Sequence, residues 1–282
     1  MTETIKHIKE SLKGIYPSSE INGLVRLIME RVCNLQPHHF LLCRDKVLPE
    51  SEKRWIYEIV ERLKRLEPIQ YILGIADFYS LEFEVSPSVL IPRPETEELV
   101  DLVILENQKK EINLLDIGTG SGCIAITLQK HLRNANVFGI DISAKALEVA
   151  RRNAKRHKVV TSFIQADILQ LEQVEAALPY PFDVIVSNPP YIREEEMKEM
   201  EPNVVEHEPH LALFVPNEDP LLFYRHIAAF GRNKLKEEGQ LYFEINSALG
   251  EKTVNMLCQA GYKDVKLIKD LSGKDRIIKA RK

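Results

Sequence analysis

The residues best suited to chemistry form one short turn, Ser187-Asn188-Pro189-Pro190-Tyr191, which follows the apolar run FDVIVS. Neither proline has an N–H group, so no helix or sheet ladder continues there, and the Pro189 carbonyl stays free to accept a hydrogen bond. The amide oxygen of Asn188 can accept a second one, and Tyr191 offers a flat aromatic face. Together these groups suit a planar NH₂ group lying under Tyr191.

Such a turn predicts group transfer to an amide nitrogen. An amide nitrogen is a weak nucleophile, because its lone pair is delocalised into the carbonyl. Hydrogen bonds from both of its N–H groups to acceptors favour a pyramidal nitrogen and place negative potential where positive charge develops. Holding the methyl donor and the nitrogen in line lowers the barrier further, through proximity. A purely structural Pro-Pro turn is the alternative. We predict Asn188, Pro189 and Tyr191 to be catalytic, and the substrate-binding set to be Asn188, Pro189, Pro190 and Tyr191.

A glycine turn lies upstream, in LLDIGTGSGCIAI at 114–126, a pattern typical of a strand, a turn and the start of a helix. Its glycines allow a tight bend and the close approach of a ligand that a Cβ would block. A dinucleotide fingerprint would have its third glycine at Cys123, so the G-x-G-x-G spacing better suits a smaller, cationic adenosyl ligand. The residues predicted to bind it are Gly118, Thr119, Gly120, Ser121 and Gly122.

Acidic residues follow the predicted strands. Asp141 closes VFGID and could accept hydrogen bonds from ribose hydroxyls, or it could cap a helix that starts at Ser143. Asp167 ends IQAD, where it could meet an adenine amino group with Ile168 against the ring, or be a loop acid. Asp116 could face the ligand's amino group or be structural. The remaining predicted cofactor contacts are Asp116, Asp141, Asp167, Ile168 and Asn188.

Strands and helices must position these turns. From residue 112 onward, short apolar runs alternate with helical stretches, which predicts an α/β fold with a mostly parallel sheet and helices on both faces. No room is left for a helix between the last two runs, so an antiparallel edge hairpin is expected. The seven predicted strands are Asn113–Ile117, Val137–Ile140, Ser162–Gln165, Asp183–Ser187, Gln240–Ile245, Val265–Lys269 and Arg276–Lys279.

The first 70 residues predict a small bundle of about four helices. Apolar residues recur at helical spacing from Ile21 to Val32 and again in Ser51–Glu67, where Trp55 falls on the apolar face. Prolines near the expected boundaries are Pro17, Pro37, Pro49 and Pro68.

A β-hairpin is expected next, because IADFY is followed by LEFEV, whose apolar residues alternate with glutamates. We therefore divide the chain into a helical domain at 1–74, a β-hairpin linker at 75–94 and a ligand-binding α/β domain at 95–282.

Composition restricts the class of protein. The 282 residues are 44% hydrophobic and 28% charged with a formal charge of −4, which is ordinary for a globular protein and argues weakly against a nucleic-acid partner. No apolar leader and no run of 18 apolar residues occur, so a cytoplasmic protein without a membrane partner is expected. Four scattered cysteines without C-x-x-C spacing, with His207 and His210 irregularly placed among acids, predict no metal site.

Two charged runs stay open to more than one interpretation. The acidic stretch 193–210 directly follows the Asn-Pro turn and is either a solvated loop or a lid that contacts substrate. The basic run RRNAKRHK at 151–158 is either the solvated face of a helix or a contact for an acidic partner.

Four motifs together identify a family. They are PIQYILG at 68–74, VLIPRPETEELV at 89–100, DIGTGSG at 116–122 and SNPPYI at 187–192. With them the chain resembles the release factor glutamine methyltransferases along nearly its whole length. PRPETE is the most discriminating part, because enzymes that methylate the amino groups of adenine and guanine share the Asn-Pro turn.

The resemblance implies a class I, Rossmann-like methyltransferase that uses S-adenosylmethionine. Its implied substrate is the glutamine in the Gly-Gly-Gln motif of bacterial class 1 peptide-chain release factors. The helical domain would dock this protein, and the enzyme would be a monomer. The resemblance leaves open whether Glu95 and Glu97 touch ligand or hold the hinge between domains. The chain departs from the family pattern at Ser80, where glycine is common, and at Ile168, where an aromatic residue is common.

Other functions fit the sequence less well. An adenine-N(6) or guanine-N(2) nucleic-acid methyltransferase could use the same turn, but it would need a basic recognition module and access to the base. The acidic balance counts against that, so no direct nucleic-acid contact is expected. A non-catalytic adaptor would have no reason to keep the glycines, Asp141 and Asn188. A nicotinamide oxidoreductase is disfavoured because Cys123 stands where the dinucleotide fingerprint has its third glycine.

Overall fold

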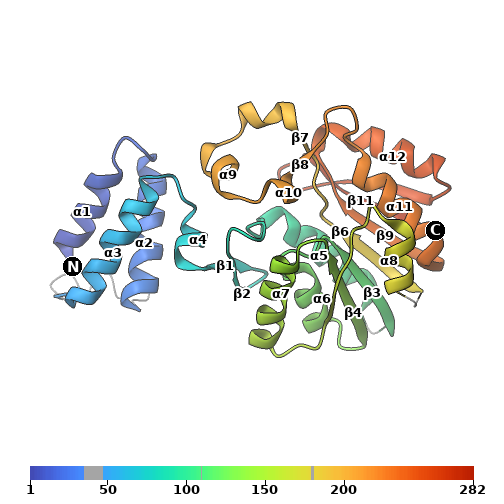
Figure 1. Ribbon diagram of the computed structural model, residues 1–282, viewed down its shortest axis with the longest axis horizontal. Helices are drawn as coiled ribbons and strands as arrows, with labels where there is room; N and C mark the ends of the chain where they lie inside the picture. The colour runs from blue at the N-terminus through green and yellow to red at the C-terminus, as the bar shows by residue number, and fades with distance from the viewer. Residues whose placement is uncertain (35–46, 109, 179–180) are drawn as a thin grey trace. The chain divides into compact units, whose positions relative to one another are not determined.

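The computed structural model describes residues 1–34, 47–108, 110–178 and 181–282 (Figure 1). Its contacts divide the chain into two compact units. The first comprises Met1–Gly74 with Glu201–His207, and the second comprises Ile75–Met200 with Glu208–Lys282. The roles expected for 1–74 in docking and for 75–94 in linkage stay predictions.

The first unit is helical, as predicted. Prolines immediately precede its second, third and fourth helices, where a missing N–H costs little because the first N–H groups of a helix have no intrahelical partner. Pro37, the other expected boundary, lies outside the described residues. The helices are α1 (Thr2–Leu12), α2 (Ser18–Cys33), α3 (Glu50–Leu63), α4 (Ile69–Leu73) and α9 (Pro202–His207).

Apolar faces of α1, α2 and α3 form the core of this unit. Ile56, Ile59 and Val60 are buried as their spacing predicts, but Trp55 is 43% exposed, so its placement on the buried face was wrong. The helix also ends at Leu63 and not at Glu67, because the chain turns at Leu66, whose φ of 59° no α-helix accommodates.

A seven-stranded sheet organises the second unit, in the order β10-β11-β9-β6-β3-β4-β5. Neighbours from β9 to β5 run parallel, whereas β11 is antiparallel to both β9 and β10. The predicted sheet and its antiparallel edge hairpin are confirmed. The strands are β3 (Ile112–Ile117), β4 (Ala135–Asp141), β5 (Ser162–Gln165), β6 (Phe182–Ser187), β9 (Leu235–Glu244), β10 (Lys263–Lys269) and β11 (Asp275–Arg281).

Helices cover both faces of the sheet, and each face has its own hydrophobic core. Side chains of α5, α6 and α7 fill one core, and side chains of α8, α11 and α12 fill the other. The bounds are α5 (Pro94–Asn107), α6 (Cys123–His131), α7 (Ala144–His157), α8 (Leu171–Ala177), α11 (Leu222–Lys234) and α12 (Gly250–Gln259).

The predicted β-hairpin is formed by β1 (Ile75–Phe78) and β2 (Leu81–Glu84), which pair antiparallel. Its two-residue turn has positive φ at both positions, 49° at Tyr79 and 59° at Ser80. The Tyr79 N–H donates to Oε1 of Glu97 at 2.8 Å. Glu97 therefore holds the hairpin turn against the start of α5.

Between β6 and α11 the described chain contains, besides α9, only short elements. They are β7 (Ile192–Arg193), the 3₁₀ helix η2 (Glu194–Glu199), α10 (His210–Leu213) and β8 (Phe214–Val215), and a second 3₁₀ helix, η3 (Ser247–Leu249), follows β9. Within the described part of the chain, no helix is both long and apolar enough to cross a membrane.

Candidate functional site

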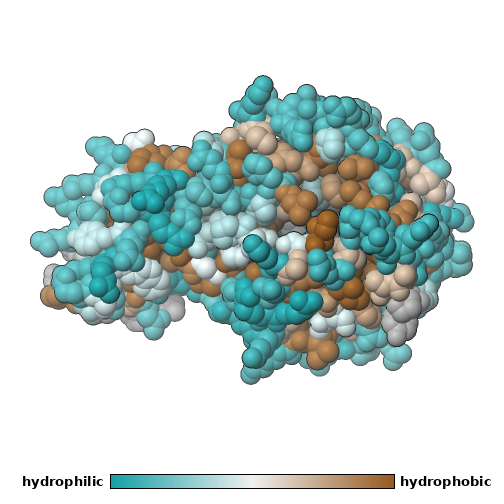
Figure 2. All heavy atoms as spheres, viewed as in Figure 1, coloured by the Kyte–Doolittle hydropathy of each residue, from teal (hydrophilic) through white to brown (hydrophobic). Residues whose placement is uncertain are grey.

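A cavity of about 280 Å³ opens in the second unit beyond the carboxyl ends of β3, β4, β5 and β6, the edge where open α/β sheets bind ligands. Figure 2 shows hydrophobic residues reaching the surface in the middle of this unit. The polar or glycine residues that line the cavity are Ser88, Gly118, Gly120, Asp141, Ser143, Asp167, Ser187 and Asn188. Its apolar lining includes Leu90, Ile142, Ile168, Pro189, Leu211 and Phe223.

The glycine turn forms the cavity floor. Gly118, Gly120 and Gly122 have φ values of 74°, 54° and 80°, a region that only glycine enters readily. A Cβ on Gly118 or Gly120 would meet nothing within 4 Å, so these two leave room for a ligand. A Cβ on Gly122 would lie 2.9 Å from Cδ1 of Ile126, so this glycine is needed for packing against α6 and α7.

Asp116 lies beneath the glycine turn and is fully buried. Its Oδ2 accepts a hydrogen bond from the Thr119 hydroxyl at 2.6 Å, but no described residue donates to Oδ1. Burial raises the pKa of this carboxyl to about 7, although the Thr119 bond favours its ionised form. A buried oxygen without a donor indicates a missing partner, such as a ligand's N–H.

Asp141 faces the cavity with both oxygens engaged by the backbone. It accepts from the N–H of Gly120 at 2.9 Å and from the N–H of Ser143 at 2.8 Å. Burial raises its pKa, and these two hydrogen bonds partly oppose the rise. The alternative in which Asp141 caps the next helix was wrong, since the N-cap of α7 is Ser143, which accepts from Ala146 N–H at 3.2 Å.

Asp167 and Ile168 lie side by side on the cavity wall. The Asp167 carboxylate accepts from Leu169 N–H at 2.9 Å and from Nε2 of Gln170 at 3.3 Å, which fixes the loop after β5. Ile168 is buried and presents an aliphatic surface suited to a flat ring.

The Asn-Pro turn also lines the cavity. The Ser187 hydroxyl donates to the Ile117 carbonyl at 2.7 Å, which fastens the end of β6 to the end of β3. Nδ2 of Asn188 donates to the Thr96 hydroxyl at 3.2 Å. Within the described part of the chain, no hydrogen bond reaches Oδ1 of Asn188 or the carbonyl oxygen of Pro189. Both acceptors stay available to a ligand.

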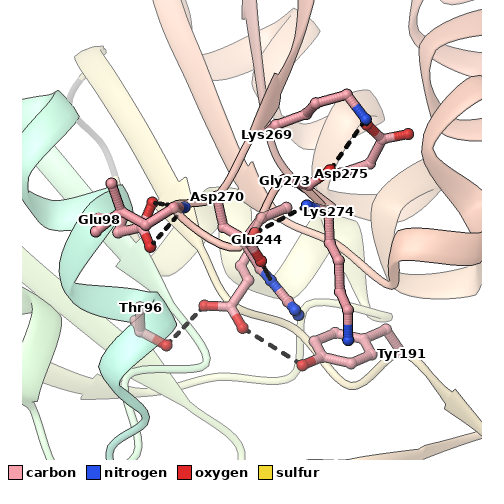
Figure 3. Close-up of polar contacts among 11 residues, drawn as sticks. Thr96, Glu98, Tyr191, Glu244, Lys269, Asp270, Gly273, Lys274 and Asp275 are labelled. Atoms are coloured by element: carbon pink, nitrogen blue, oxygen red, sulfur yellow. Dashed lines mark hydrogen bonds and ion pairs between the residues drawn. The ribbon is translucent and has the colours of Figure 1, made fainter.

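Not every predicted site residue reaches the cavity. Tyr191 packs against the core and donates its hydroxyl to Oε1 of Glu244 at 3.3 Å (Figure 3). The predicted residues that line the cavity are Gly118, Gly120, Asp141, Asp167, Ile168, Asn188, Pro189 and Pro190. Those outside its lining are Asp116, Thr119, Ser121, Gly122 and Tyr191.

Thr96 and Glu244 were not predicted as part of the site. Thr96 is 3% exposed and Glu244 is 1% exposed, and the Thr96 hydroxyl donates to Oε2 of Glu244 at 2.6 Å (Figure 3). Thr96 lies within PRPETE, so the motif itself was a signal. Nothing in the sequence near Glu244 distinguishes it from an exposed strand residue.

Glu208 was also missed. Its side chain is 1% exposed, forms an ion pair with Arg93 at 2.5 Å and accepts from the Ile91 N–H at 3.2 Å. Glu208, which immediately precedes Pro209, is thereby bonded to the residues that follow Leu90. The two segments Ser88–Leu90 and Pro209–Ala212, which both contribute to the cavity lining, are held together in this way. The solvated-loop interpretation of 193–210 therefore fails at its end, where Glu208 is buried.

The basic run at 151–158 has one buried polar residue, Asn153. It accepts from Glu84 N–H at 2.7 Å and donates to the carbonyls of Glu84 and Ser121, each at 2.9 Å. Arg152 pairs with the Glu84 side chain at 2.7 Å. This side of α7 is thus not simply a solvated face, because it joins the β-hairpin to the glycine turn.

The two histidines of the acidic stretch have other neighbours. His207 hydrogen-bonds the Arg65 carbonyl at 3.1 Å, and the His210 ring packs edge-on against Phe214. Among the residues that the structure describes, no group of three or more His, Cys, Asp or Glu side chains is arranged to hold a metal ion.

Comparison with known families matches both parts of the chain. Residues 3–74 match the family described as the PrmC N-terminal domain. Residues 108–230 match the family described as a methyltransferase domain.

Full-length relatives agree with each other. The chain is 46% identical to a release factor glutamine methyltransferase of Bacteroides thetaiotaomicron, with 100% of each chain covered. It is 47% identical to the protein of that name from Flavobacterium psychrophilum, covering 96% of this chain and 95% of the relative.

Solved structures resemble the fold at low sequence identity. A methyltransferase from Pyrococcus furiosus has a TM-score of 0.53 at 17% identity, over 83% of this chain and 98% of that one. A 16S rRNA N2 G1207 methyltransferase from T. thermophilus has a TM-score of 0.54 at 16% identity, over 74% of this chain and 49% of that one. At these low identities, both similarities support the fold and nothing more.

Proposed function

The chain belongs to the release factor glutamine methyltransferases, and we propose that it methylates the side-chain amide nitrogen of a release-factor glutamine. The methyl donor is S-adenosylmethionine, and the acceptor is the glutamine of the Gly-Gly-Gln motif in bacterial class 1 peptide-chain release factors. The observation that carries the proposal is the pair of unused acceptors, Oδ1 of Asn188 and the Pro189 carbonyl, on one wall of the cavity.

The cavity's residues fit the cofactor. When bound, S-adenosylmethionine supplies a methyl group on a positively charged sulfur. Asp116, Asp141 and Asp167 place three carboxyl groups in or beneath the cavity, which suits a cation. Oδ1 of Asp116 lacks a donor, and the Asp141 oxygens keep lone pairs for ribose hydroxyls beyond their two backbone bonds.

Asn188 and Pro189 hold the glutamine amide. Each accepts one of the two N–H bonds, which orients the nitrogen and raises the negative potential around it as positive charge develops. The amide proton becomes acidic only after methylation, so the site needs no strong base. Tyr191 supports the turn from behind through its bond to Glu244, and its predicted contact with the substrate plane stays a prediction.

The acceptor is part of a folded protein, so docking must involve more surface than the cavity. We assign this role to the helical unit, residues 1–74, and to segment 193–210 beside the active-site turn. Because the proposed substrate takes part in bacterial translation, we propose that the enzyme acts in the cytoplasm.

The test is transfer of labelled methyl groups from S-adenosylmethionine to three acceptors. These are an unmethylated bacterial release factor, its Gly-Gly-Gln loop variant with alanine for glutamine, and nucleic acid supplied as duplex DNA or ribosomal RNA. We expect label on the intact release factor alone. Label on nucleic acid alone would replace the proposal with a base-amine methyltransferase, and equal label on the alanine variant would exclude the glutamine as acceptor.

A further inference from the structure

Three side chains form a hydrogen-bond chain behind the cavity wall. Nδ2 of Asn188 donates to Oγ1 of Thr96 at 3.2 Å, and the Thr96 hydroxyl donates to Oε2 of Glu244 at 2.6 Å. Figure 3 shows Thr96 and Tyr191 on opposite sides of the Glu244 carboxylate, one toward each oxygen. Only Asn188 of the three bonded in this chain lines the cavity.

The donor and acceptor properties of the three groups fix their directions. Glu244 accepts at both of its carboxylate oxygens, from the hydroxyls of Thr96 and Tyr191, and each hydroxyl has one hydrogen. Because Thr96 gives its hydrogen to Glu244, it can only accept from Asn188. The amide nitrogen of Asn188 must therefore face Thr96, and its oxygen is left for the cavity.

The opposite orientation would be unproductive. With Thr96 held as an acceptor, a rotated Asn188 would place its oxygen against the hydroxyl's lone pairs. Its NH₂ would then face the NH₂ of a substrate amide, and two donors cannot bond to each other. Selecting one of two nearly isosteric amide orientations thus decides whether the site can bind its substrate.

The chain is held by rigid elements. Thr96 lies in the first turn of α5, where its N–H donates to the Arg93 carbonyl at 3.1 Å. Glu244 ends β9 and is in register with Ile277 of β11. Both side chains are nearly fully buried, so water does not compete for these bonds.

We propose that Thr96 and Glu244 are positioning residues that lock the Asn188 amide with its oxygen toward the substrate. The proposal rests on the proposed function, since it explains how the same turn accepts the glutamine N–H. It also gives the threonine of PRPETE a role: this residue acts through Asn188 and touches neither substrate nor cofactor.

The first test is Thr96→Val, which keeps the side-chain shape and removes the hydroxyl. We expect kcat for release-factor methylation to fall about 10- to 100-fold, because misorientation of a positioning group costs on this order. The Kd for S-adenosylmethionine should stay near the wild-type value. Thr96→Ser retains the hydroxyl and should restore turnover, whereas Thr96→Cys, which differs from serine in one atom and accepts poorly, should not.

A double-mutant cycle separates positioning from a general structural effect. On an Asn188→Ala background the amide is gone, so Thr96→Val should lower kcat little further. An equal loss on both backgrounds, or wild-type turnover in Thr96→Val, would overturn the inference. If the wild-type chain transfers no methyl to a release factor, the proposed function itself fails, and that result is distinct from an additive cycle. If Thr96→Val does not fold, the serine and cysteine pair gives the same comparison.

Discussion

At the scale of single residues, the site is defined by hydrogen-bonding capacity that the protein leaves unused. Asn188 gives its NH₂ to Thr96 and keeps its oxygen, while Asp116 keeps one buried oxygen without a donor. Both atoms lie at or beneath the cavity, and the rest of their polar groups are satisfied. We therefore expect ligand N–H groups at these two atoms.

Replacing Asn188 by alanine should affect turnover and leave cofactor binding nearly unchanged. The substitution removes one proposed acceptor for the glutamine N–H and keeps the contacts that we propose Asp141 and Asp167 make with the cofactor. We expect kcat to fall about 10²- to 10³-fold, the usual cost of one preorganised hydrogen-bonding group. Single-turnover rates and calorimetric Kd values for S-adenosylmethionine would check this. Wild-type turnover in Asn188→Ala would contradict the predicted substrate contact.

Asp116 should make stability depend on pH in the ligand-free protein. Burial raises its pKa from 3.8 to about 7, so between these values the folded state holds a proton that the unfolded chain has released. Stability contributed by this group is full below about pH 4 and is lost as pH rises toward 7. At about 1.4 kcal/mol per unit, the loss approaches about 4 kcal/mol.

Asp116→Asn tests this directly, because asparagine can still accept from Thr119 and does not titrate in this range. Chemical unfolding at several pH values should show that the free energy of unfolding of the variant rises relative to that of the wild type between about pH 4 and about pH 8. A difference that is constant across this range would show that Asp116 is ionised throughout.

From the sequence, the residues that line the cavity were easier to predict than the residues that position them. Asn188, Pro189, Asp141 and the glycines follow strand ends, and strand ends of a parallel sheet converge. The positioning partners could not be found in this way, because Thr96 is 92 residues from Asn188 and Glu244 is 53 residues from Tyr191. Only the packing of α5 and β9 brings them together.

At the scale of elements, the β-hairpin contains a conformation that its sequence does not favour. Ser80 adopts a φ of 59°, where a Cβ is strained and glycine is not. Ser80→Gly should therefore raise the free energy of unfolding by about 0.5 kcal/mol, because relief of strain exceeds the entropy cost of glycine. Ser80→Val is the matched control and should lower it. Equal effects from both substitutions would argue against backbone strain.

Two arginine–glutamate pairs of the second unit should differ in their contribution to stability. The Arg93–Glu208 pair includes a carboxylate that is 1% exposed, whereas the Arg152–Glu84 pair is 49% and 38% exposed. Arg93→Ala leaves a buried charge without its partner and should cost about 3 kcal/mol. Arg152→Ala should cost at most about 1 kcal/mol.

Urea unfolding of both variants measures the difference. Arg93→Ala should also weaken S-adenosylmethionine binding, because Glu208 would no longer hold two segments of the cavity lining together. Similar stability losses from the two substitutions would contradict the role of Glu208 as a buried anchor.

The elements were predictable where hydrophobic periodicity is strong. All seven strands were expected, with β5 at its observed bounds, although β9 begins at Leu235, five residues before its predicted start. The short elements between 192 and 215 were not expected, because the stretch is acidic and lacks helical or strand periodicity. There the backbone is fixed by tertiary bonds such as those of Glu208.

At the scale of the whole molecule, every residue that lines the cavity belongs to the second unit. Bound S-adenosylmethionine should therefore slow amide hydrogen exchange in the glycine turn, the end of β4 and the loop after β5. It should leave α1, α2 and α3 unchanged. Hydrogen exchange with mass spectrometry, with and without cofactor, would check this. Protection of the helices would show that the first unit responds to cofactor binding.

The assignment of a protein substrate also belongs to this scale. A formal charge of −4 gives the chain no general attraction to nucleic acid, and residues 3–74 match the family described as the PrmC N-terminal domain. Sequence composition supported this choice but could not identify the acceptor atom. The Asn-Pro turn predicted an amide nitrogen as the acceptor, and the two free acceptors in the cavity support that prediction.

The most direct measurement is to locate the methyl group on the product. A purified, unmethylated release factor would be incubated with the enzyme and S-adenosylmethionine, digested, and sequenced by tandem mass spectrometry. We expect one added methyl group, on the side-chain nitrogen of the glutamine in the Gly-Gly-Gln peptide, and far less of it in the same reaction time with Asn188→Ala. A methyl group on any other residue, or an unmodified glutamine after complete cofactor turnover, would contradict the proposed reaction.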